Sequence, residues 1–173
     1  MQATGRTTLS KARVWLIAAA AALLGLALDQ VTKSLAVAHL TPGEQHHLIG
    51  SLLQLNLTRN PGAAFSTGTS MTAVISCIAI VAGVVVAWVV VAKTRDWLWA
   101  LALGFLEAGI LGNVVDRLVR EPSPLNGHVV DFLELPHWPI FNVADCFITV
   151  AAVLIVVQAA RGMKLDGTRE VAR

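Results

Sequence analysis

The sequence predicts an all-α membrane protein with four transmembrane helices and a small extracytoplasmic part that is rich in β-strand. Three observations support this prediction: the composition, four long apolar segments, and an uneven distribution of Lys and Arg along the chain. Of the 173 residues, 55% are hydrophobic and only 14% are charged, and the mean hydropathy is +0.67. An ordinary soluble domain has about 25% charged residues. We therefore expect residues 1–173 to form a single integral membrane domain.

The first apolar segment is uninterrupted from Val14 to Leu28, and helical composition continues past Asp29 and Lys33. With that extension the segment reaches the ~20 residues that a bilayer core requires, so we expect a span at about 14–36. An alternative is a cleaved signal peptide, with a basic start and a small-residue site at Ala36–Ala38. The two charged residues before that site argue against cleavage.

Three further spans are predicted at about 72–92, 97–115 and 140–160. The second span contains no charged residue, whereas the third contains Glu107 and the fourth contains Asp145. An ionisable group inside a span is costly, so these two side chains should face other helices or a polar cavity rather than lipid.

The connections differ in length and character. The link Lys93–Asp96 is minimal, whereas 40–70 and 117–138 are long, polar and interrupted by Pro and Gly. Partial alternation in Leu53–Thr58 indicates a short strand or two, and Asn60-Pro61-Gly62 indicates a turn. We expect the elaborated side of the protein to be the one that carries these two connections.

The distribution of Lys and Arg predicts the orientation. Nine of the 13 basic residues precede the first span, lie between the second and third, or follow the fourth. They are Arg6, Lys11, Arg13, Lys93, Arg95, Arg161, Lys164, Arg169 and Arg173. By the positive-inside rule both termini are cytoplasmic, and 40–70 and 117–138 are extracytoplasmic. With this orientation, four of the five Trp residues lie at the cytoplasmic ends of the spans, and Trp138 lies near the opposite interface.

Several classes of function have little support. The net charge is only +2 and the basic residues form no face interleaved with aromatics, so nucleic-acid binding is not expected. The histidines lack the helical spacing of metal ligands, so no metal is expected. Cys77 and Cys146 lie in apolar segments, at no ligand spacing, and read as small core residues. No serine shows a nucleophile elbow.

Two aspartates near the C-terminal end carry the most chemical information. Asp145 lies about one turn into the fourth span, on one helix face with Asn142 and Thr149 if that helix begins near Ile140. Asp131 lies in the preceding loop, close enough in sequence to fold over the helix end. Two carboxylates in a low-dielectric site share a proton, which provides one base to activate water and one acid to protonate a carbonyl oxygen. The alternative is that Asp131 caps a turn and Asp145 pairs with an arginine.

Other polar residues interrupt the first and third spans. Gly109, Asn113 and Asp116 share one helix face, and Arg117 could neutralise Asp116 or another acid nearby. Asp29 and Lys33 are spaced i, i+4, which favours a local ion pair. Glu107 could relay protons or bond a neighbouring helix.

Five short motifs, taken in order, resemble the bacterial lipoprotein signal peptidases (signal peptidase II). They are Leu28-Asp29-Gln30-Val31-Thr32-Lys33, Asn60-Pro61-Gly62-Ala63-Ala64-Phe65-Ser66, Gly112-Asn113-Val114-Val115-Asp116-Arg117, Val129-Val130-Asp131-Phe132 and Phe141-Asn142-Val143-Ala144-Asp145. The resemblance implies a metal-independent, cofactor-free intramembrane aspartic endopeptidase of the bacterial cytoplasmic membrane, with its active site near the extracytoplasmic face. Such an enzyme removes signal peptides from prolipoproteins just before a cysteine that carries diacylglyceryl.

The resemblance also implies roles for individual residues. Asp131 and Asp145 match the catalytic pair. The matches to polar residues that line the site are Asn60, Asn113, Arg117 and Asn142, and the matches to supporting positions are Asp29, Lys33, Gly62 and Asp116. The stretch Leu40–Phe65 matches an external strand-rich cradle. The stretch Arg117–His128 is longer than is usual in the family.

The implied partners are prolipoproteins with a diacylglyceryl-cysteine, membrane lipid, and cyclic lipopeptide inhibitors of the globomycin type. Two rival readings come from other classes. One is a small ion-coupled transporter that uses Glu107 and Asp145, although the chain lacks the matching broken helices of such proteins. The other is a membrane subunit without chemistry.

Overall fold

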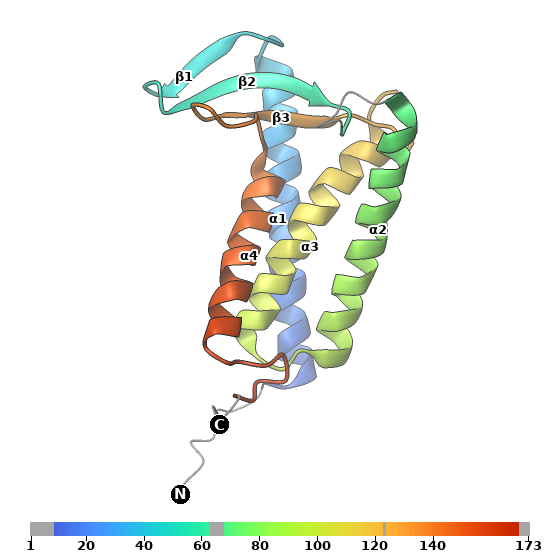
Figure 1. Ribbon diagram of the computed structural model, residues 1–173, viewed down its shortest axis with the longest axis vertical. Helices are drawn as coiled ribbons and strands as arrows, with labels where there is room; N and C mark the ends of the chain where they lie inside the picture. The colour runs from blue at the N-terminus through green and yellow to red at the C-terminus, as the bar shows by residue number, and fades with distance from the viewer. Residues whose placement is uncertain (1–8, 63–67, 123, 170–173) are drawn as a thin grey trace, which may run out of the picture.

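The computed structural model describes residues 9–62, 68–122 and 124–169, and it consists of an upright helical bundle with a small sheet across one end (Figure 1). The helices are α1 (Lys11–His39), α2 (Gly68–Lys93), α3 (Trp97–Val119) and α4 (Val143–Ala160). All four are long and apolar enough to cross a membrane. The end that carries the sheet is called the sheet end below, and the opposite end, where the described part of the chain begins at Leu9 and finishes at Arg169, is called the terminus end.

The sheet has three antiparallel strands in the order β1-β2-β3: β1 (Gln45–Ile49), β2 (Leu53–Asn60) and β3 (Val129–Glu134). β1 and β2 lie within the connection for which one or two strands are predicted. β3 was not predicted, and the expected position of Asp131 in a loop is wrong, because it lies in this strand. Its neighbours Val130 and Phe132 pack with Leu57 and Ala36 in a buried cluster that fixes the sheet on the end of α1.

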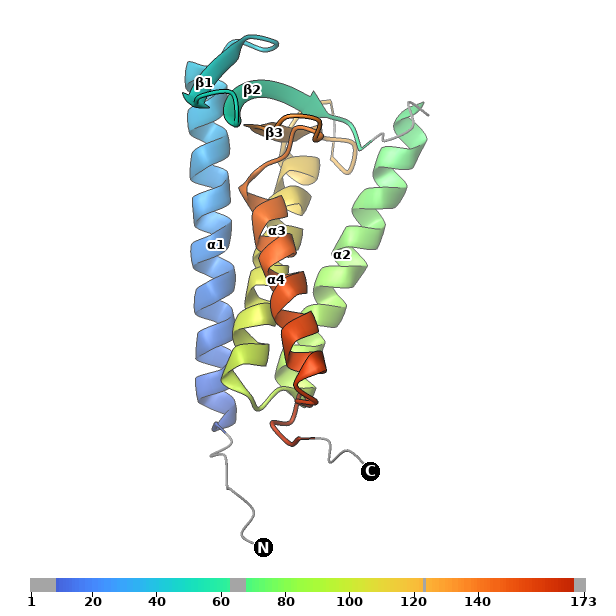
Figure 2. The same ribbon diagram turned by 60° about the vertical axis from the view of Figure 1, so that its left-hand side comes forward.

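α3 is the central helix and packs against the other three, most extensively against α1 and α4. Two glycines permit this close approach: a Cβ on Gly104 would lie 2.6 Å from the carbonyl oxygen of Ala18, and one on Gly109 would lie 2.5 Å from that of Ala144. α2 is less closely packed and leans away from the bundle toward the sheet end (Figure 2).

Two hydroxyl groups hold the sheet end of α2. Thr72 Oγ1 donates to the carbonyl oxygen of Pro61 at 2.6 Å, and Ser76 Oγ lies 2.6 Å from that of Leu125. Both side chains are almost fully buried, and the other residues from Thr72 to Ala92 are apolar. The two long connections therefore both rest on the outer turns of this helix.

The terminus end is closed by backbone hydrogen bonds. Arg95 N donates to Leu165 O at 2.8 Å, and Leu9 N donates to Arg95 O at 3.2 Å. Asp96 caps α3 and also accepts from the buried Gln158 side chain of α4 at 2.8 Å. The chain after α4 thus folds back under α3 and ties the bundle together.

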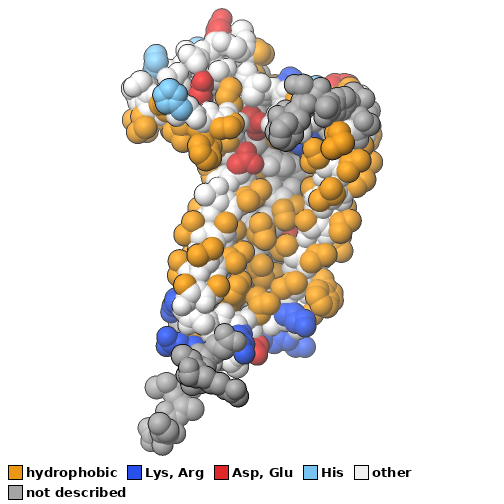
Figure 3. Space-filling view, viewed as in Figure 1, with side chains coloured by type: hydrophobic (Ala, Val, Ile, Leu, Met, Phe, Trp, Pro, Cys, Tyr) orange, Lys and Arg blue, Asp and Glu red, His pale blue; other side chains and the backbone are white. Residues whose placement is uncertain are grey.

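The surface of the helices is apolar over most of its height, with basic residues at the terminus end (Figure 3). Trp15, Trp88 and Trp97 are about half exposed close to that end, and Trp138 is exposed in the connection after β3. Cys77 is exposed on α2 and Cys146 is half-buried, so the prediction of a core position is wrong for Cys77.

α4 begins later than predicted. Its first residue is Val143, and Asn142 is the N-cap, so Asn142 precedes the helix rather than sharing a face with Asp145. Asn142 Oδ1 accepts from Asp145 N, and Asp145 Oδ2 accepts from Asn142 N, both at 3.1 Å. This reciprocal capping box satisfies two backbone donors that the helix leaves unpaired.

Candidate active site

The ten residues singled out in the sequence all lie at the sheet end of the bundle. Asp131 is supplied by β3, and Asp145 by the first turn of α4. Asn60 ends β2, whereas Asn113 and Asp116 lie near the end of α3. Two connections and three helices therefore converge on one place. Residues 63–66 of the second motif lie outside the described residues.

Two asparagine amides link the two carboxylates. Asn142 Nδ2 donates to Asp131 Oδ1 at 2.6 Å and to Asn113 Oδ1 at 3.1 Å. Asn113 Nδ2 then donates to Asp145 Oδ1 at 3.0 Å. Asn60 Nδ2 holds the other oxygen of Asp131, and the chain Asp131–Asn142–Asn113–Asp145 fixes the two carboxylates relative to each other.

Asp131 is buried, and this changes its acidity. Burial raises the pKa of its carboxyl from the ordinary 3.8 to about 6, and the nearby charge of Asp145 acts in the same direction. The hydrogen bonds from Asn60 (2.9 Å) and Asn142 lower the pKa, as does the charge of Lys33. Asp145 is only partly buried. The two carboxylates thus differ in environment: one is enclosed and the other borders open space.

A fully buried lysine lies directly behind the pair. Lys33 Nζ is 2.9 Å from Asp29 Oδ2 and 2.9 Å from Asp116 Oδ2, and all three side chains are completely buried. The same ammonium group donates to Asn113 Oδ1 at 3.1 Å. The predicted i, i+4 pair of Asp29 and Lys33 is confirmed as a contact, but the lysine also joins α1 to α3 and reaches the amide chain.

The acids of this buried cluster hold backbone groups near the pair. Asp29 Oδ1 accepts from Ala144 N at 2.8 Å, next to Asp145. Asp116 Oδ2 accepts from Val130 N at 3.1 Å, next to Asp131. Asp29 thus positions the Asp145 carboxylate, and Asp116 positions the Asp131 carboxylate, each through the backbone of the residue that precedes it.

Arg117 was expected to neutralise Asp116 or another acid nearby, and the charges of both Asp131 and Asp116 act on its guanidinium. Within the described part of the chain the ion pairs of Asp116 are to Lys33 and to Arg120, at 2.6 Å, and not to Arg117. The sequence reasoning missed Arg120, although the i, i+4 spacing from Asp116 is the usual signal for such a pair. It also missed Gln30, whose side chain donates to Asp29 Oδ2 at 3.1 Å and to Gly112 O at 3.0 Å.

Gly62 and Arg117 meet at the turn after β2. Gly62 has a φ of +89°, which favours glycine, and a Cβ at this position would lie 3.0 Å from both terminal nitrogens of Arg117. Gly62 N donates to Asn60 Oδ1 at 2.8 Å, which orients the Asn60 amide toward Asp131. The turn therefore holds both Asn60 and the mostly buried guanidinium in place.

The structure does not bring Glu107 into this site. It lies in the middle of α3, six residues or nearly two turns from Asn113 toward the terminus end, and its Oε2 atom is buried without a hydrogen-bond partner among the described residues. Over the same residues, no three His, Cys, Asp or Glu side chains are grouped as metal ligands. The expectation of metal-independent chemistry stays a prediction.

The site opens sideways. Acidic side chains gather in a hollow below the sheet, between α4 and the outer part of α2 (Figure 3). One enclosed carboxyl, one accessible carboxyl and a set of fixed amide donors are the groups that acid–base hydrolysis of an amide needs. The hollow lies between the apolar surfaces of α4 and α2 at the sheet end (Figure 3).

Comparison with known proteins identifies relatives over most of the chain. A family model described as signal peptidase (SPase) II matches residues 21–161. The lipoprotein signal peptidase of Rhodococcus jostii (strain RHA1) is 49% identical over 146 residues, which cover 84% of this chain and 73% of the relative. That of Leifsonia xyli subsp. xyli (strain CTCB07) is 40% identical over 172 residues, which cover 98% of this chain and 79% of the relative.

Two solved structures described as bacterial membrane enzymes have the same fold. The first is 27% identical in sequence with a TM-score of 0.74, and the match covers 88% of this chain and 95% of that chain. The second is 25% identical with a TM-score of 0.71, and the match covers 95% and 98% respectively. The four helices and the small sheet are therefore an arrangement already observed in membrane enzymes.

Proposed function

Because the chain belongs to the signal peptidase II family of membrane proteases that remove signal peptides from lipoproteins, we propose that Asp131 and Asp145 are its catalytic pair. The observation that supports this assignment most directly is the amide chain that links the two carboxylates, together with their unlike environments. Membership of this family of proteases excludes the two alternative functions, an ion-coupled transporter and a membrane subunit without chemistry.

The pair works with one shared proton. Asp131 holds it, because burial raises the pKa of this carboxyl to about 6, and Asp145 is the base. Asp145 takes a proton from a water molecule as the water oxygen attacks the scissile carbonyl carbon, and Asp131 donates its proton to the carbonyl oxygen. The resulting diol then collapses: Asp131 takes back a proton from one of its hydroxyl groups, the carbon–nitrogen bond breaks, and the proton on Asp145 passes to the leaving nitrogen.

The amides keep this geometry before substrate arrives. Asn60 and Asn142 donate to Asp131, and Asn113 donates to Asp145, so that neither carboxyl has to reorient in the reaction. Arg117 and Gly62 support the turn that carries Asn60. Asp29 and Asp116, which Lys33 joins, hold the backbone beside each carboxyl.

The substrate is a prolipoprotein whose signal helix lies in the bilayer, and cleavage falls just before a cysteine that carries diacylglyceryl. The scissile bond of such a chain lies at the membrane surface, where the hollow between α4 and α2 opens (Figure 3). The lipid on the cysteine and the small residues before it supply specificity. Cyclic lipopeptides of the globomycin type, which present an acyl chain beside a peptide, fit the same opening.

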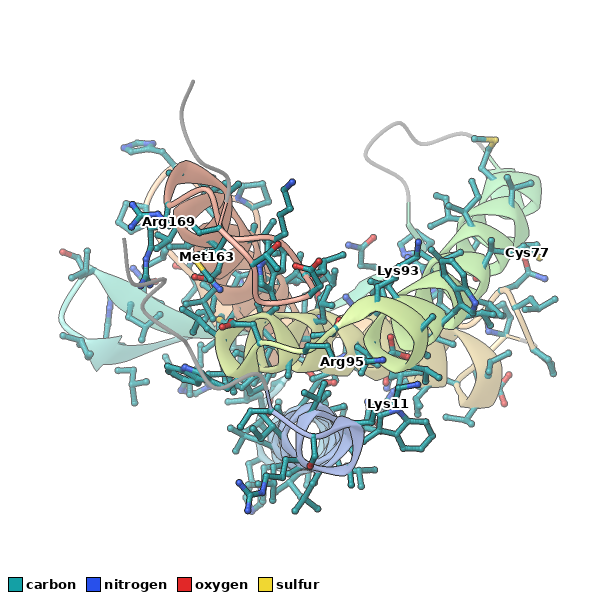
Figure 4. The ribbon with its side chains drawn as sticks, turned by 90° about the horizontal axis from the view of Figure 1, so that it is seen from below. Lys11, Cys77, Lys93, Arg95, Met163 and Arg169 are labelled. Atoms are coloured by element: carbon teal, nitrogen blue, oxygen red, sulfur yellow. The ribbon has the colours of Figure 1, made fainter. Side chains whose placement is uncertain are left out.

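The sheet end faces the outside of the bacterial cytoplasmic membrane, and both termini face the cytoplasm. The positive-inside rule supports this orientation, because the described basic residues outside the site are concentrated at the terminus end (Figure 4). Active-site chemistry then takes place at the extracytoplasmic face, where exported lipoproteins arrive.

The pair is tested with asparagine substitutions. Asn is nearly isosteric with Asp but can neither act as base nor carry the shared proton. We expect Asp131→Asn and Asp145→Asn each to lose more than the ~10²–10⁴-fold of a single acid–base group, while both variants still bind a lipidated substrate. Turnover of a purified lipidated prolipoprotein, followed by gel shift, gives the measurement.

Asp29→Asn and Asp116→Asn are the matched controls, since the same substitution falls on a carboxyl of the buried lysine cluster. These two variants should lose folded yield and retain a measurable part of the activity. Substantial turnover by either the Asp131 or the Asp145 variant, with normal folded yield, would overturn the assignment.

A further inference from the structure

A continuous groove runs along the opposite half of the bundle from the active site, between α1 and α2. Its inner part is bounded by small and apolar residues of these two helices, with Gly104 and Leu103 of α3 as its floor. Its outer part reaches the terminus end at Lys11, and Trp15, Ala19 and Val91 line both parts. Apart from Glu107 at the inner end, no residue that lines the groove is acidic.

The length of the groove corresponds to one leaflet of a membrane. On α1 it extends from Lys11 to Ala22. At 1.5 Å per residue this is about 16 Å, or roughly half of a ~30 Å hydrocarbon core. The groove therefore begins at the interface and ends near the middle of the bilayer, where Glu107 and Gly104 close it. An acyl chain of the adjacent leaflet has the length to fill it.

The mouth of the groove is positively charged. Lys11 lines it directly. Seen from this end, Lys11, Arg95 and Lys93 lie around the same side of the bundle, where α1 faces the end of α2 (Figure 4). Trp15 lies at the depth where tryptophan meets lipid headgroups. A phosphate at the mouth would be attracted by these cations, whereas the basic start of a signal peptide would be repelled.

The width of the groove excludes a further helix. α1 and α2 touch each other as well as α3, so the space between them is narrower than the ~10 Å diameter of a helix with its side chains. An acyl chain is thinner than a helix, and the alanines of α1 that line the groove leave room for such a chain.

We propose that this groove binds one anionic phospholipid from the leaflet at the terminus end, with an acyl chain between α1 and α2 and its phosphate at Lys11. The site is separate from the catalytic pair and does not depend on the reaction assigned to it. The lipid fills the seam where the bundle packs least closely and ties the inner half of α2 to α1.

The test measures retained lipid on the purified full-length protein by native mass spectrometry. The probes are dipalmitoyl phosphatidylglycerol and dipalmitoyl phosphatidylcholine, titrated separately. The wild-type protein should retain a single phosphatidylglycerol in preference to phosphatidylcholine. Ala19→Phe, which fills the groove, should weaken this binding at least tenfold, and Lys11→Gln should abolish the preference for the anionic lipid.

Two matched controls lie on the same helix outside the groove. Ala27→Phe adds the same bulk at an exposed position, and Arg13→Gln removes the same charge from the terminus end. Both should bind within twofold of wild type. Ala12→Phe provides a second groove-filling variant if Ala19→Phe lowers the melting temperature. Equal losses in the controls, unchanged binding in the folded groove variants, or no preference for phosphatidylglycerol in the wild type would overturn the proposal.

Discussion

At the scale of single residues, the site depends on amide donors as much as on the two acids. Asn142 has three functions: it caps α4, donates to Asp131 and donates to Asn113. The sequence indicated the two acids because a charged residue in an apolar segment is conspicuous. It could not indicate which amides touch which carboxyl, since those contacts join residues from β2, α3, β3 and the cap of α4.

Removal of the Asn60 amide should shift the pH profile. The hydrogen bond from Asn60 lowers the pKa of Asp131 by favouring its ionised form. Without that bond the pKa rises, Asp131 keeps its proton to higher pH, and the alkaline fall in activity moves upward. We expect Asn60→Ala to show this shift in kcat/KM against pH, together with a lower maximum. An alkaline limb that moves downward would contradict the proposed proton on Asp131.

Lys33 should be essential to folding rather than to the reaction. Replacement by Met leaves Asp29 and Asp116 fully buried without their shared cation, which typically costs about 3–5 kcal/mol. We expect Lys33→Met to unfold at much lower temperature in detergent, with a poor yield. Adding Asp29→Asn should restore part of the stability, because one uncompensated charge is removed. If Lys33→Met alone were as stable as the wild type, the buried lysine cluster would not be needed for folding.

At the scale of elements, the glycines of α3 set the position of α4, which carries the proposed catalytic Asp145. A Cβ on Gly109 would lie 2.4 Å from a side-chain carbon of Ile148 and 2.5 Å from Ala144 O, beside Asp145. Gly109→Ala must therefore push α4 away from α3. Since a misplacement of about 1 Å can cost 10²-fold in rate, we expect a fall in kcat of that order with the chain still folded.

Gly83→Ala is the control for this substitution. The added Cβ would lie 3.4 Å from its nearest neighbours, Glu107 Oε1 and a side-chain carbon of Ile110, which is close to ordinary contact. Melting temperature and kcat should remain near the wild-type values. If Gly109→Ala were equally harmless, α4 would not be held as closely as the structure indicates.

The elements also show where sequence patterns succeed and fail. Hydropathy located all four helices because each presents many apolar residues to lipid. It did not locate the start of α4, since Ile140 and Phe141 continue the apolar run while the capping box begins the helix at Val143. It missed β3 because Asp131 interrupts an otherwise strand-like run of valine, phenylalanine and leucine.

At the scale of the whole molecule, the orientation predicted from the distribution of Lys and Arg is open to direct measurement. In a background without Cys77 and Cys146, cysteines at Ser51 and Ser123 should react with an impermeant thiol reagent in intact cells. A cysteine at Thr168 should be protected until the cells are lysed. The reverse pattern would place the site on the cytoplasmic face and remove the basis for a role in processing exported lipoproteins.

The unequal lengths of the helices bear on the bilayer itself. α1 has 29 residues, whereas α4 has only 18, or about 43 Å against about 27 Å at 1.5 Å per residue. A hydrophobic segment shorter than the ~30 Å core is accommodated by local thinning of the membrane. The bilayer should therefore dip where α4 meets lipid, beside the opening of the site. Water and lipid headgroups would then reach Asp145. The enzyme would not have to move the scissile peptide bond out of the hydrocarbon core in order to hydrolyse it.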